Sequence, residues 1–328
     1  MLSLYPEESR EFNRGEKIDH VSAQIDTWCN EIKSACGGIG TDEMKLSQVL
    51  GTKGPRERYL ISLRYKELYR LSLLSEVQSE TSGDYGALLN LLVQPLEDAE
   101  ATVVRHATKG IGTLEKLLYP VIAGRTTEEL HILKQAYLKK YQEDLGVALA
   151  DDLSGDLKVF VQAILNLTPP KFNPLIHTEA KAIEIAEVIY KAGEAKWGTD
   201  EATFCNTICS IPAQFLASVD AAYTTKHGHG LFRAIQSEFS GKAKDVILYH
   251  VGMILDPIHT IADLIERTMK GIGTDEFGLS ATLVRYQQLL PQVKPAYAAK
   301  YGVSLQDRIT GETTGDYRQL LLYVVDTI

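Results

Sequence analysis

The chain has little basic charge and no long hydrophobic run. Its 328 residues carry 34 lysines and arginines against 43 aspartates and glutamates, which gives a formal net charge of −9. No basic stripe is present to displace the counterions of a phosphate backbone, which argues against a nucleic-acid-binding protein. No apolar run approaches the roughly 18 residues that cross a bilayer. The first 17 residues are charged and lack the apolar core of a signal peptide, so we expect a cytosolic protein.

Cysteine is scarce. Cys29, Cys36, Cys205 and Cys209 are too few for a disulfide scaffold in a chain of this length. Cys205 and Cys209 stand four residues apart on an expected helix and would present two thiols on one face, but no third soft metal ligand is close in sequence. We therefore expect the four cysteines to be buried as small apolar residues.

One loop sequence occurs four times. Its clearest copy reads Met-Lys-Gly-Ile-Gly-Thr-Asp-Glu at residues 269–276, and related copies lie at 38–43, 110–113 and 196–201. A second pattern, an acid followed three residues later by glycine, accompanies each copy. The second glycine of each loop precedes this acid by 39 or 40 residues in all four copies. Four copies in register are internal repeats, and repeats determine the fold before any other pattern is considered.

Apolar residues recur at helical spacing, and strand patterns are nearly absent. In the first unit a helix from about Asp19 ends at the glycines after Cys36. Thr41 is expected to cap the next helix, with Asp42 and Glu43 in its first turn. This unit contains five short helices, and the same order recurs three more times. We therefore predict an all-α fold of four repeats, each built from five short helices.

The predicted boundaries divide the chain into six segments. Residues 1–17 are expected to be a short solvated arm. Pro169, Pro170 and Pro174 are incompatible with a helix interior and mark a linker, which separates two halves of two repeats each. The segments are an N-terminal arm at 1–18, repeat one at 19–94, repeat two at 95–167, a linker at 168–178, repeat three at 179–256 and repeat four at 257–328.

The glycine loops have the chemistry of a calcium site. Glycines at a helix end let the backbone turn its carbonyl oxygens into one concave rim. Such carbonyls together with a bidentate carboxylate form the oxygen-only shell that Ca²⁺ takes at ~2.3–2.6 Å. Mg²⁺ tolerates a backbone-rich shell less well, and Zn²⁺ prefers sulfur or imidazole. An incomplete protein shell leaves a position that a lipid phosphate oxygen can fill.

Other functional motifs fail on inspection. The EF-hand pattern, the Walker phosphate loop, the dinucleotide fingerprint and the Gly-x-Ser-x-Gly elbow are all absent. The histidines of His227-Gly228-His229-Gly230 offer a metal site as an alternative, but a loop between helices without a carboxylate partner is favoured. No nucleophile–base pair or haem motif stands out, so we predict no enzyme.

Three copies of Gly-x-Gly-Thr and a fourth that reads Lys-Trp-Gly-Thr, each with a downstream acid before Ser/Thr-Gly, resemble the annexin family over about residues 19–328. The resemblance implies a slightly curved disc of four five-helix repeats, with calcium loops on the convex face that docks on acidic phospholipid. It also implies that the first three ligands of each site are main-chain carbonyls and the fourth is an acidic side chain. The implied ligands are Cys36, Gly38, Gly40 and Glu80; Thr108, Gly110, Gly112 and Asp152; Gly193, Lys196, Gly198 and Glu238; and Met269, Gly271, Gly273 and Glu312.

Some positions depart from the family pattern. Gly37 replaces a lysine that the family often presents to lipid headgroups. Leu114 replaces an acid that interacts with the helix dipole and is not a ligand. Asp152 is one methylene shorter than glutamate. We therefore rank sites four and three first, then one, then two.

The family's central polar channel is only partly represented. Arg125 matches one of its arginines, whereas Pro120 and Ala281 stand where charged channel residues are usual. The sequence therefore argues against an ion-channel role.

The leading hypothesis is calcium-dependent, peripheral binding to acidic phospholipid. Four apolar residues in the loops are candidates for membrane contact, with ordinary exposed or half-packed residues as the alternative: Ile39, Ile111, Trp197 and Ile272. Self-association on the membrane and a cytoskeletal or polysaccharide partner stay open. The rival hypothesis is a calcium-insensitive helical scaffold that binds proteins.

Overall fold

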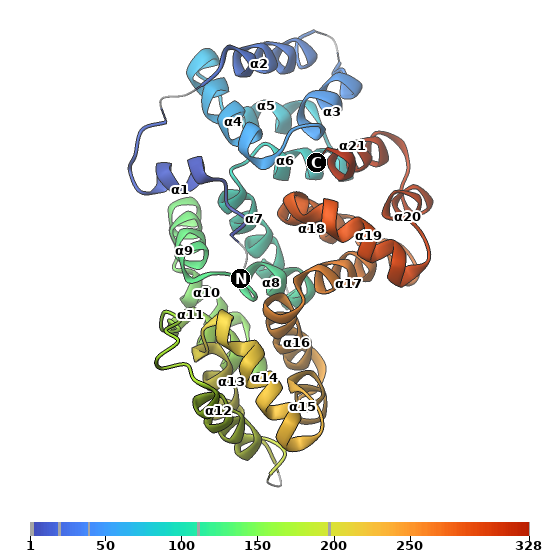
Figure 1. Cartoon of the computed structure of the whole chain (residues 1–328). Helices are drawn as coiled ribbons and strands as arrows, with labels where there is room; N and C mark the ends of the chain where they lie inside the picture. Colours follow the sequence, from blue (N-terminus) through green and yellow to red (C-terminus); the bar gives the residue numbers. More distant parts are fainter. Residues whose placement is uncertain (1–2, 19–20, 39, 110–111, 196–197, 328) are drawn as a thin grey trace. The chain divides into compact units, whose positions relative to one another are not determined.

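The computed structural model describes residues 3–18, 21–38, 40–109, 112–195 and 198–327. Within these ranges the regular elements are all helices, which confirms the predicted all-α class (Figure 1). The chain divides into two compact units. One comprises Met1–Ser3 with Val104–Pro257, and the other comprises Leu4–Val103 with Ile258–Ile328.

The second unit contains repeats one and four. Their helices are α2 (Ala23–Ala35), α3 (Glu43–Gly51), α4 (Pro55–Tyr69), α5 (Leu73–Glu80) and α6 (Gly83–Leu92), then α17 (Pro257–Met269), α18 (Glu276–Tyr286), α19 (Leu290–Tyr301), α20 (Leu305–Glu312) and α21 (Gly315–Asp326). A short 3-10 helix, Gln287–Leu289, joins α18 to α19. The two repeats pack through α3 against α21, where a Cβ on Gly51 would lie 2.8 Å from the Cβ of Tyr323. Glycine at this position therefore allows the two helices to approach closely.

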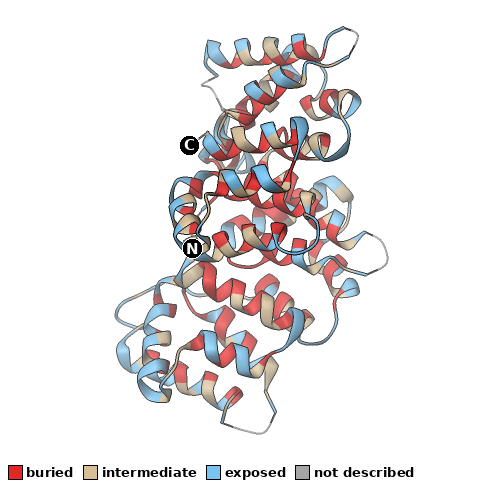
Figure 2. Ribbon diagram, turned by 90° about the vertical axis from the view of Figure 1, so that its right-hand side faces the viewer, coloured by how far each residue is buried: buried red, intermediate tan, exposed pale blue. Residues whose placement is uncertain are grey.

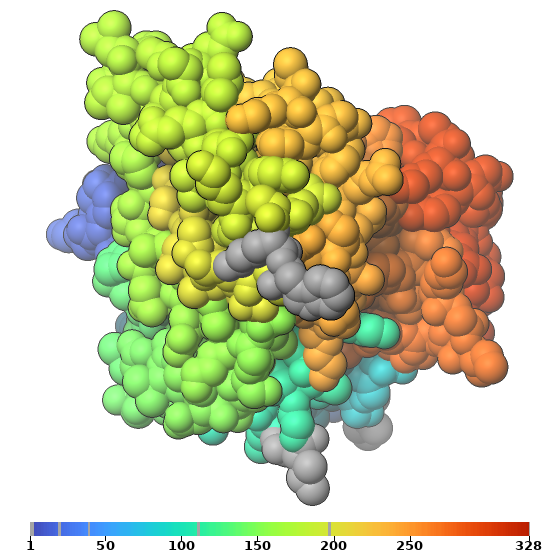
Figure 3. All heavy atoms as spheres, turned by 90° about the horizontal axis from the view of Figure 1, so that it is seen from below, coloured from blue at the N-terminus to red at the C-terminus, as the bar shows by residue number. Residues whose placement is uncertain are grey.

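The first unit contains repeat three and most of repeat two. The helices of these repeats are α7 (Leu96–Thr108), α8 (Glu115–Ile122), α9 (Thr127–Tyr141), α10 (Leu145–Asp152) and α11 (Gly155–Asn166), then α12 (Glu179–Ala192), α13 (Glu201–Ser210), α14 (Ala213–His227), α15 (Leu231–Glu238) and α16 (Gly241–Leu255). No helix lies between Asn166 and Glu179, where the linker was predicted. Figure 3 shows the outer surface of this unit from below, in green to gold.

Every repeat closes its first loop in the same way. The residue after the loop threonine donates its N–H to a carbonyl of the preceding helix, as in Asp42 to Ala35 at 3.0 Å and Asp275 to Thr268 at 2.8 Å. Asp42 also caps α3, because its side chain accepts from the Lys45 N–H at 2.9 Å. The prediction that Thr41 caps this helix was therefore wrong, since the Thr41 hydroxyl donates to a distant acid instead.

The apolar faces of the helices meet in the interior (Figure 2). All four cysteines are free and buried, as the sequence predicted. Burial raises the pKa of the Cys205 thiol to about 12, so this group stays protonated at neutral pH and behaves as an apolar residue. Among the described residues, no helix is long and apolar enough to cross a membrane.

The prediction of a solvated N-terminal arm was wrong. Residues Glu7–Asn13 form helix α1, and Tyr5 and Ser9 are buried. The Tyr5 hydroxyl donates to Glu100 Oε2 at 2.5 Å, and the Ser9 hydroxyl donates to Glu97 Oε1 at 2.6 Å. Buried carboxylates need such partners, and here the N-terminal segment supplies them.

Removing the Ser9 hydroxyl tests this contact. Burial raises the pKa of the Glu97 carboxyl, and the hydrogen bond from Ser9 opposes that rise by stabilising the ionised form. Ser9→Ala therefore raises the folded-state pKa further. It should lower the free energy of unfolding by about 1–3 kcal/mol at neutral pH. The loss exists above the folded pKa and shrinks as pH falls through it.

The measurement is urea denaturation at neutral and mildly acidic pH. Ser210→Ala, at an exposed position of α13, is the control and should change stability little. An equal loss for Ser9→Ala at both pH values would contradict an interaction with ionised Glu97.

Candidate metal centre

The four loops share one backbone feature, a glycine in the left-handed region. The second glycine has a positive φ in every repeat: 85° at Gly40, 85° at Gly112, 82° at Gly198 and 83° at Gly273. This left-handed region is costly for any residue with a Cβ, although a Cβ at these positions would meet nothing within 4 Å. The glycines are therefore required by the turn itself and not by crowding.

A threonine hydroxyl connects each loop to its distant acid in three of the repeats. Thr41 Oγ1 donates to Glu80 Oε2 at 2.9 Å, and Thr199 Oγ1 donates to Glu238 Oε2 at 2.7 Å. In repeat four Thr274 Oγ1 lies 3.2 Å from an oxygen of Glu312. The structure thus places these three predicted acids beside their predicted loops.

Repeat two differs in this connection. Thr113 donates at 3.3 Å to the main-chain oxygen of Asp152, and among the described residues no hydrogen bond is donated to the Asp152 carboxylate. Leu114 occupies the N-cap position of α8 and provides no side-chain cap. The glycine loop of repeat two is therefore the least firmly connected to its distant acid, because the acid is shorter and Leu114 provides no cap.

Oxygen atoms dominate the candidate sites. Within the described chain, no hydrogen bond is donated to the carbonyl oxygens of Gly38, Gly40, Gly271 and Gly273, all of which are exposed. Among the same described residues, no group of three or more His, Cys, Asp or Glu side chains gathers. A metal ion bound at these loops would have main-chain oxygens and one carboxylate as its ligands. Such hard donors fit Ca²⁺ and do not fit Zn²⁺.

In repeat three the carboxylate packs against the loop backbone. Gly193 is buried, and a Cβ on it would lie 3.0 Å from Cγ of Glu238. The neighbouring Glu194 has a structural role, since it accepts from the Tyr223 hydroxyl at 2.5 Å and pairs with His229 at 3.3 Å. His229, in the loop that joins α14 to α15, therefore contacts an acid that follows α12, and the expectation that this histidine loop has no carboxylate partner was wrong.

Repeat one has a second acid close to its site. Glu76 lies one turn before Glu80 and pairs with Lys33 at 2.9 Å. Burial, together with the charges of Glu76 and Glu80, raises the pKa of the Cys36 thiol to about 11. Because Lys33 balances the charge of Glu76, Glu80 is the acid of this pair that is left for the site.

Repeat four contains a side chain that sequence reasoning missed. Arg308 donates from Nη1 to Glu312 Oε1 at 2.6 Å and from Nη2 to the main-chain oxygen of Met269 at 2.6 Å. Both acceptors belong to the predicted site. The spacing of Arg308 and Glu312, four residues apart on one helix, was the sequence signal that could have revealed the ion pair.

Several predicted residues lie outside the described part of the chain. These are the ligands Gly110 and Lys196 and the membrane-contact residues Ile39, Ile111 and Trp197. Ile272, the fourth membrane-contact residue, is described and is fully exposed at 109%. Thr108 is half-buried at the end of α7, where its hydroxyl donates to the carbonyl of Val104 at 3.0 Å.

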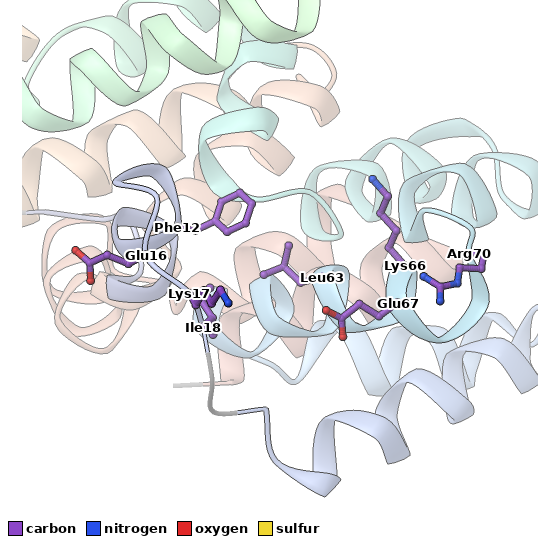
Figure 4. Close-up of a pocket in the computed structure, with 8 residues that line it drawn as sticks. All are labelled: Phe12, Glu16, Lys17, Ile18, Leu63, Lys66, Glu67 and Arg70. Atoms are coloured by element: carbon purple, nitrogen blue, oxygen red, sulfur yellow. The ribbon is translucent and has the colours of Figure 1, made fainter.

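A pocket separate from the loops lies between the N-terminal segment and α4. Figure 4 shows Phe12 and Leu63 as its apolar part, with Lys66, Glu67 and Arg70 along α4. Its lining carries both signs of charge, so it shows no preference for a charged ligand.

A sequence model of the annexin family matches this chain four times, at residues 29–92, 97–164, 184–249 and 261–324. The chain belongs to the annexin family. Annexins are generally calcium-dependent phospholipid-binding proteins rather than enzymes. Each matched segment lies inside one predicted repeat. The fold prediction of four annexin repeats is confirmed, while the ligand assignments and the disc shape stay predictions.

Individual annexins resemble the chain over almost all of its length. Annexin A5 of Cynops pyrrhogaster is 32% identical over 299 residues, which cover 90% of this chain and 92% of that protein. Human annexin A3 is 30% identical over 314 residues, covering 95% of this chain and 96% of that protein. The solved structure of annexin III has a TM-score of 0.86 at 29% identity, covering 94% of this chain and 95% of that one.

Glycine at the loop corner can be tested in repeat four. Gly273→Ala should lower the free energy of unfolding by about 1–2 kcal/mol, because alanine is strained at a φ of 83°. The matched control is Gly311→Ala, where a Cβ also meets nothing within 4 Å but the backbone is helical. This control should be neutral or stabilising by up to about 1 kcal/mol. Similar effects of both changes in thermal or urea unfolding would contradict the strain argument.

Proposed function

We propose that this annexin binds acidic phospholipid membranes in a calcium-dependent way and without catalysis. The observation that carries the proposal comes from repeats one and four of this annexin. There a threonine-held carboxylate lies beside exposed loop glycines whose carbonyls accept no hydrogen bond from the described residues. In repeat one the ligands would be the carbonyls of Cys36, Gly38 and Gly40 with the carboxylate of Glu80.

The other sites follow the same plan. Calcium, when bound, supplies positive charge that the chain lacks and links protein oxygens to lipid phosphates. The proposed ligands are Thr108, Gly110, Gly112 and Asp152 in repeat two; Gly193, Lys196, Gly198 and Glu238 in repeat three; and Met269, Gly271, Gly273 and Glu312 in repeat four.

The charge of the protein explains why calcium is needed. A net charge of −9 opposes approach to an anionic leaflet, where each basic residue would contribute about 1 kcal/mol of attraction. Several modest sites on one chain raise each other's effective concentration at the membrane, so their combined affinity exceeds that of any single loop. The apolar side chain of Ile272 extends fully into solvent beside its site and can enter the headgroup region.

Sedimentation with phosphatidylserine vesicles tests calcium dependence. The protein should pellet with calcium and stay in solution with a chelator. The double variant Glu80→Gln/Glu238→Gln should raise the calcium concentration for half-maximal pelleting by about tenfold, because two of the sites that act together are weakened. The double variant Glu67→Gln/Glu184→Gln removes the same charge from exposed positions and should behave like the native protein. Equal pelleting with and without calcium would instead favour a calcium-insensitive scaffold.

Ile272 tests the apolar contact. Ile272→Ala should weaken vesicle binding by roughly threefold to tenfold through lost apolar burial. It should leave calcium binding without lipid unchanged, because the side chain is not a ligand. Leu175→Ala is the matched control, since Leu175 is 87% exposed in the linker and far in sequence from any loop. Equal effects of both variants on vesicle binding would contradict membrane contact by Ile272.

A further inference from the structure

The guanidinium of Arg308 lies where the loop and the acid of repeat four meet. Its two terminal nitrogens bond two different predicted calcium ligands, the carbonyl of Met269 and the carboxylate of Glu312, each at 2.6 Å. Its Nε lies 3.4 Å from Oε2 of Glu266 on α17. One positively charged group thus connects both halves of the site.

These contacts are partly shielded from water. The side chains of Arg308 and Glu312 are 27% and 24% exposed, and that of Glu266 is 15% exposed. Arginine is always protonated in proteins, and its planar fork makes strong charge-assisted hydrogen bonds. The guanidinium is therefore a permanent cation that satisfies oxygens which a metal ion would otherwise need.

Repeat one contains the same pair with its charges reversed. Seven residues before the second loop glycine stands Lys33 in repeat one and Glu266 in repeat four. Four residues before the distant acid stands Glu76 in repeat one and Arg308 in repeat four. Lys33 bonds Glu76 at 2.9 Å, so the cation of this pair lies on the first helix of the repeat and contacts Glu76, not the predicted ligand Glu80.

Repeats two and three have no charged residue four positions before the distant acid. Ala148 and Ala234 occupy the position four residues before the acid. Repeat four therefore differs from the other three repeats in having a cation four residues before its acid, one turn away on the same helix. The difference between repeats one and four is the placement of one ion pair.

We propose that Arg308 is an internal cation that competes with calcium for the site of repeat four. This inference rests on the proposed function. Calcium and the guanidinium cannot share Met269 and Glu312, so metal binding requires Arg308 to leave both oxygens and retain Glu266. Repeat four then fills at higher calcium than repeats one and three, which reverses the ranking that the sequence suggested.

Calorimetric titration with CaCl₂ in the absence of lipid tests the competition. The background is Glu80→Gln/Asp152→Asn/Glu238→Gln, which leaves repeat four as the site with an intact acid. Adding Arg308→Met to this background should tighten calcium binding by about tenfold, the equivalent of one charge-assisted hydrogen bond. Adding Glu312→Gln as well should abolish the gain, because the freed carboxylate is then absent.

A charge swap keeps the ion pair while moving the cation. In the same background, Glu266→Lys/Arg308→Glu reproduces the arrangement of repeat one and should also tighten calcium binding. This variant keeps an ion pair between α17 and α20, so it tests the competition even if Arg308→Met disturbs the structure. The reverse swap in an otherwise native chain, Lys33→Glu/Glu76→Arg, should weaken binding to repeat one.

Thermal unfolding provides an independent readout. Without calcium, Arg308→Met should unfold at a lower temperature than the native chain, because the Met269 and Glu312 oxygens lose their internal partner. With saturating calcium this difference should shrink or reverse. Unchanged or weaker calcium binding in both Arg308→Met and the charge swap would overturn the competition while leaving the proposed function intact. Failure of the native chain to bind calcium at any site would overturn both.

Discussion

The candidate sites depend on one hydrogen bond that spans 38 or 39 residues of sequence, from a loop threonine to an acid at the end of another helix. Thr41 with Glu80, Thr199 with Glu238 and Thr274 with Glu312 repeat this contact. The glycine corner forms in all four repeats, and in three of them the threonine hydroxyl holds the acid beside it through one carboxylate oxygen. A carboxylate oriented in advance loses less conformational entropy when it binds an ion.

Neighbouring charges make the four repeats unequal. In repeat one Lys33 pairs with Glu76 and not with Glu80, whereas in repeat four Arg308 pairs with Glu312 from within the same helix. Repeat two lacks a carboxylate bond to its threonine because Asp152 is shorter. On the proposed function, one backbone design would support sites of graded calcium affinity. The differences would come from the ligand Asp152 in repeat two, and in repeats one and four from side chains that are not ligands. A membrane-binding protein with graded sites would respond to calcium over a wider concentration range than one with four identical sites.

The helices, the repeats and the burial of the cysteines could be predicted from local sequence patterns. Helical periodicity and helix-ending glycines depend on only a few neighbouring residues. The constant spacing of glycine and acid also predicted which loops meet. Contacts between distant residues were not predictable in this way. Ser9 is buried because it bonds Glu97, and Thr41 does not cap its helix because it bonds Glu80. The bond from Arg308 to Met269 likewise depends on how α17 and α20 pack, which no pattern around Arg308 indicates.

The central claim is that glycine-bent carbonyls and a threonine-held carboxylate form one cation site. A crystal structure grown with calcium tests it most directly. The account predicts an ion within ~2.3–2.6 Å of the Gly38 and Gly40 carbonyls and of the Glu80 carboxylate. It is contradicted if Glu80 stays bonded to Thr41 alone while calcium binds elsewhere on the chain, or if saturating calcium leaves the loop of repeat one without an ion.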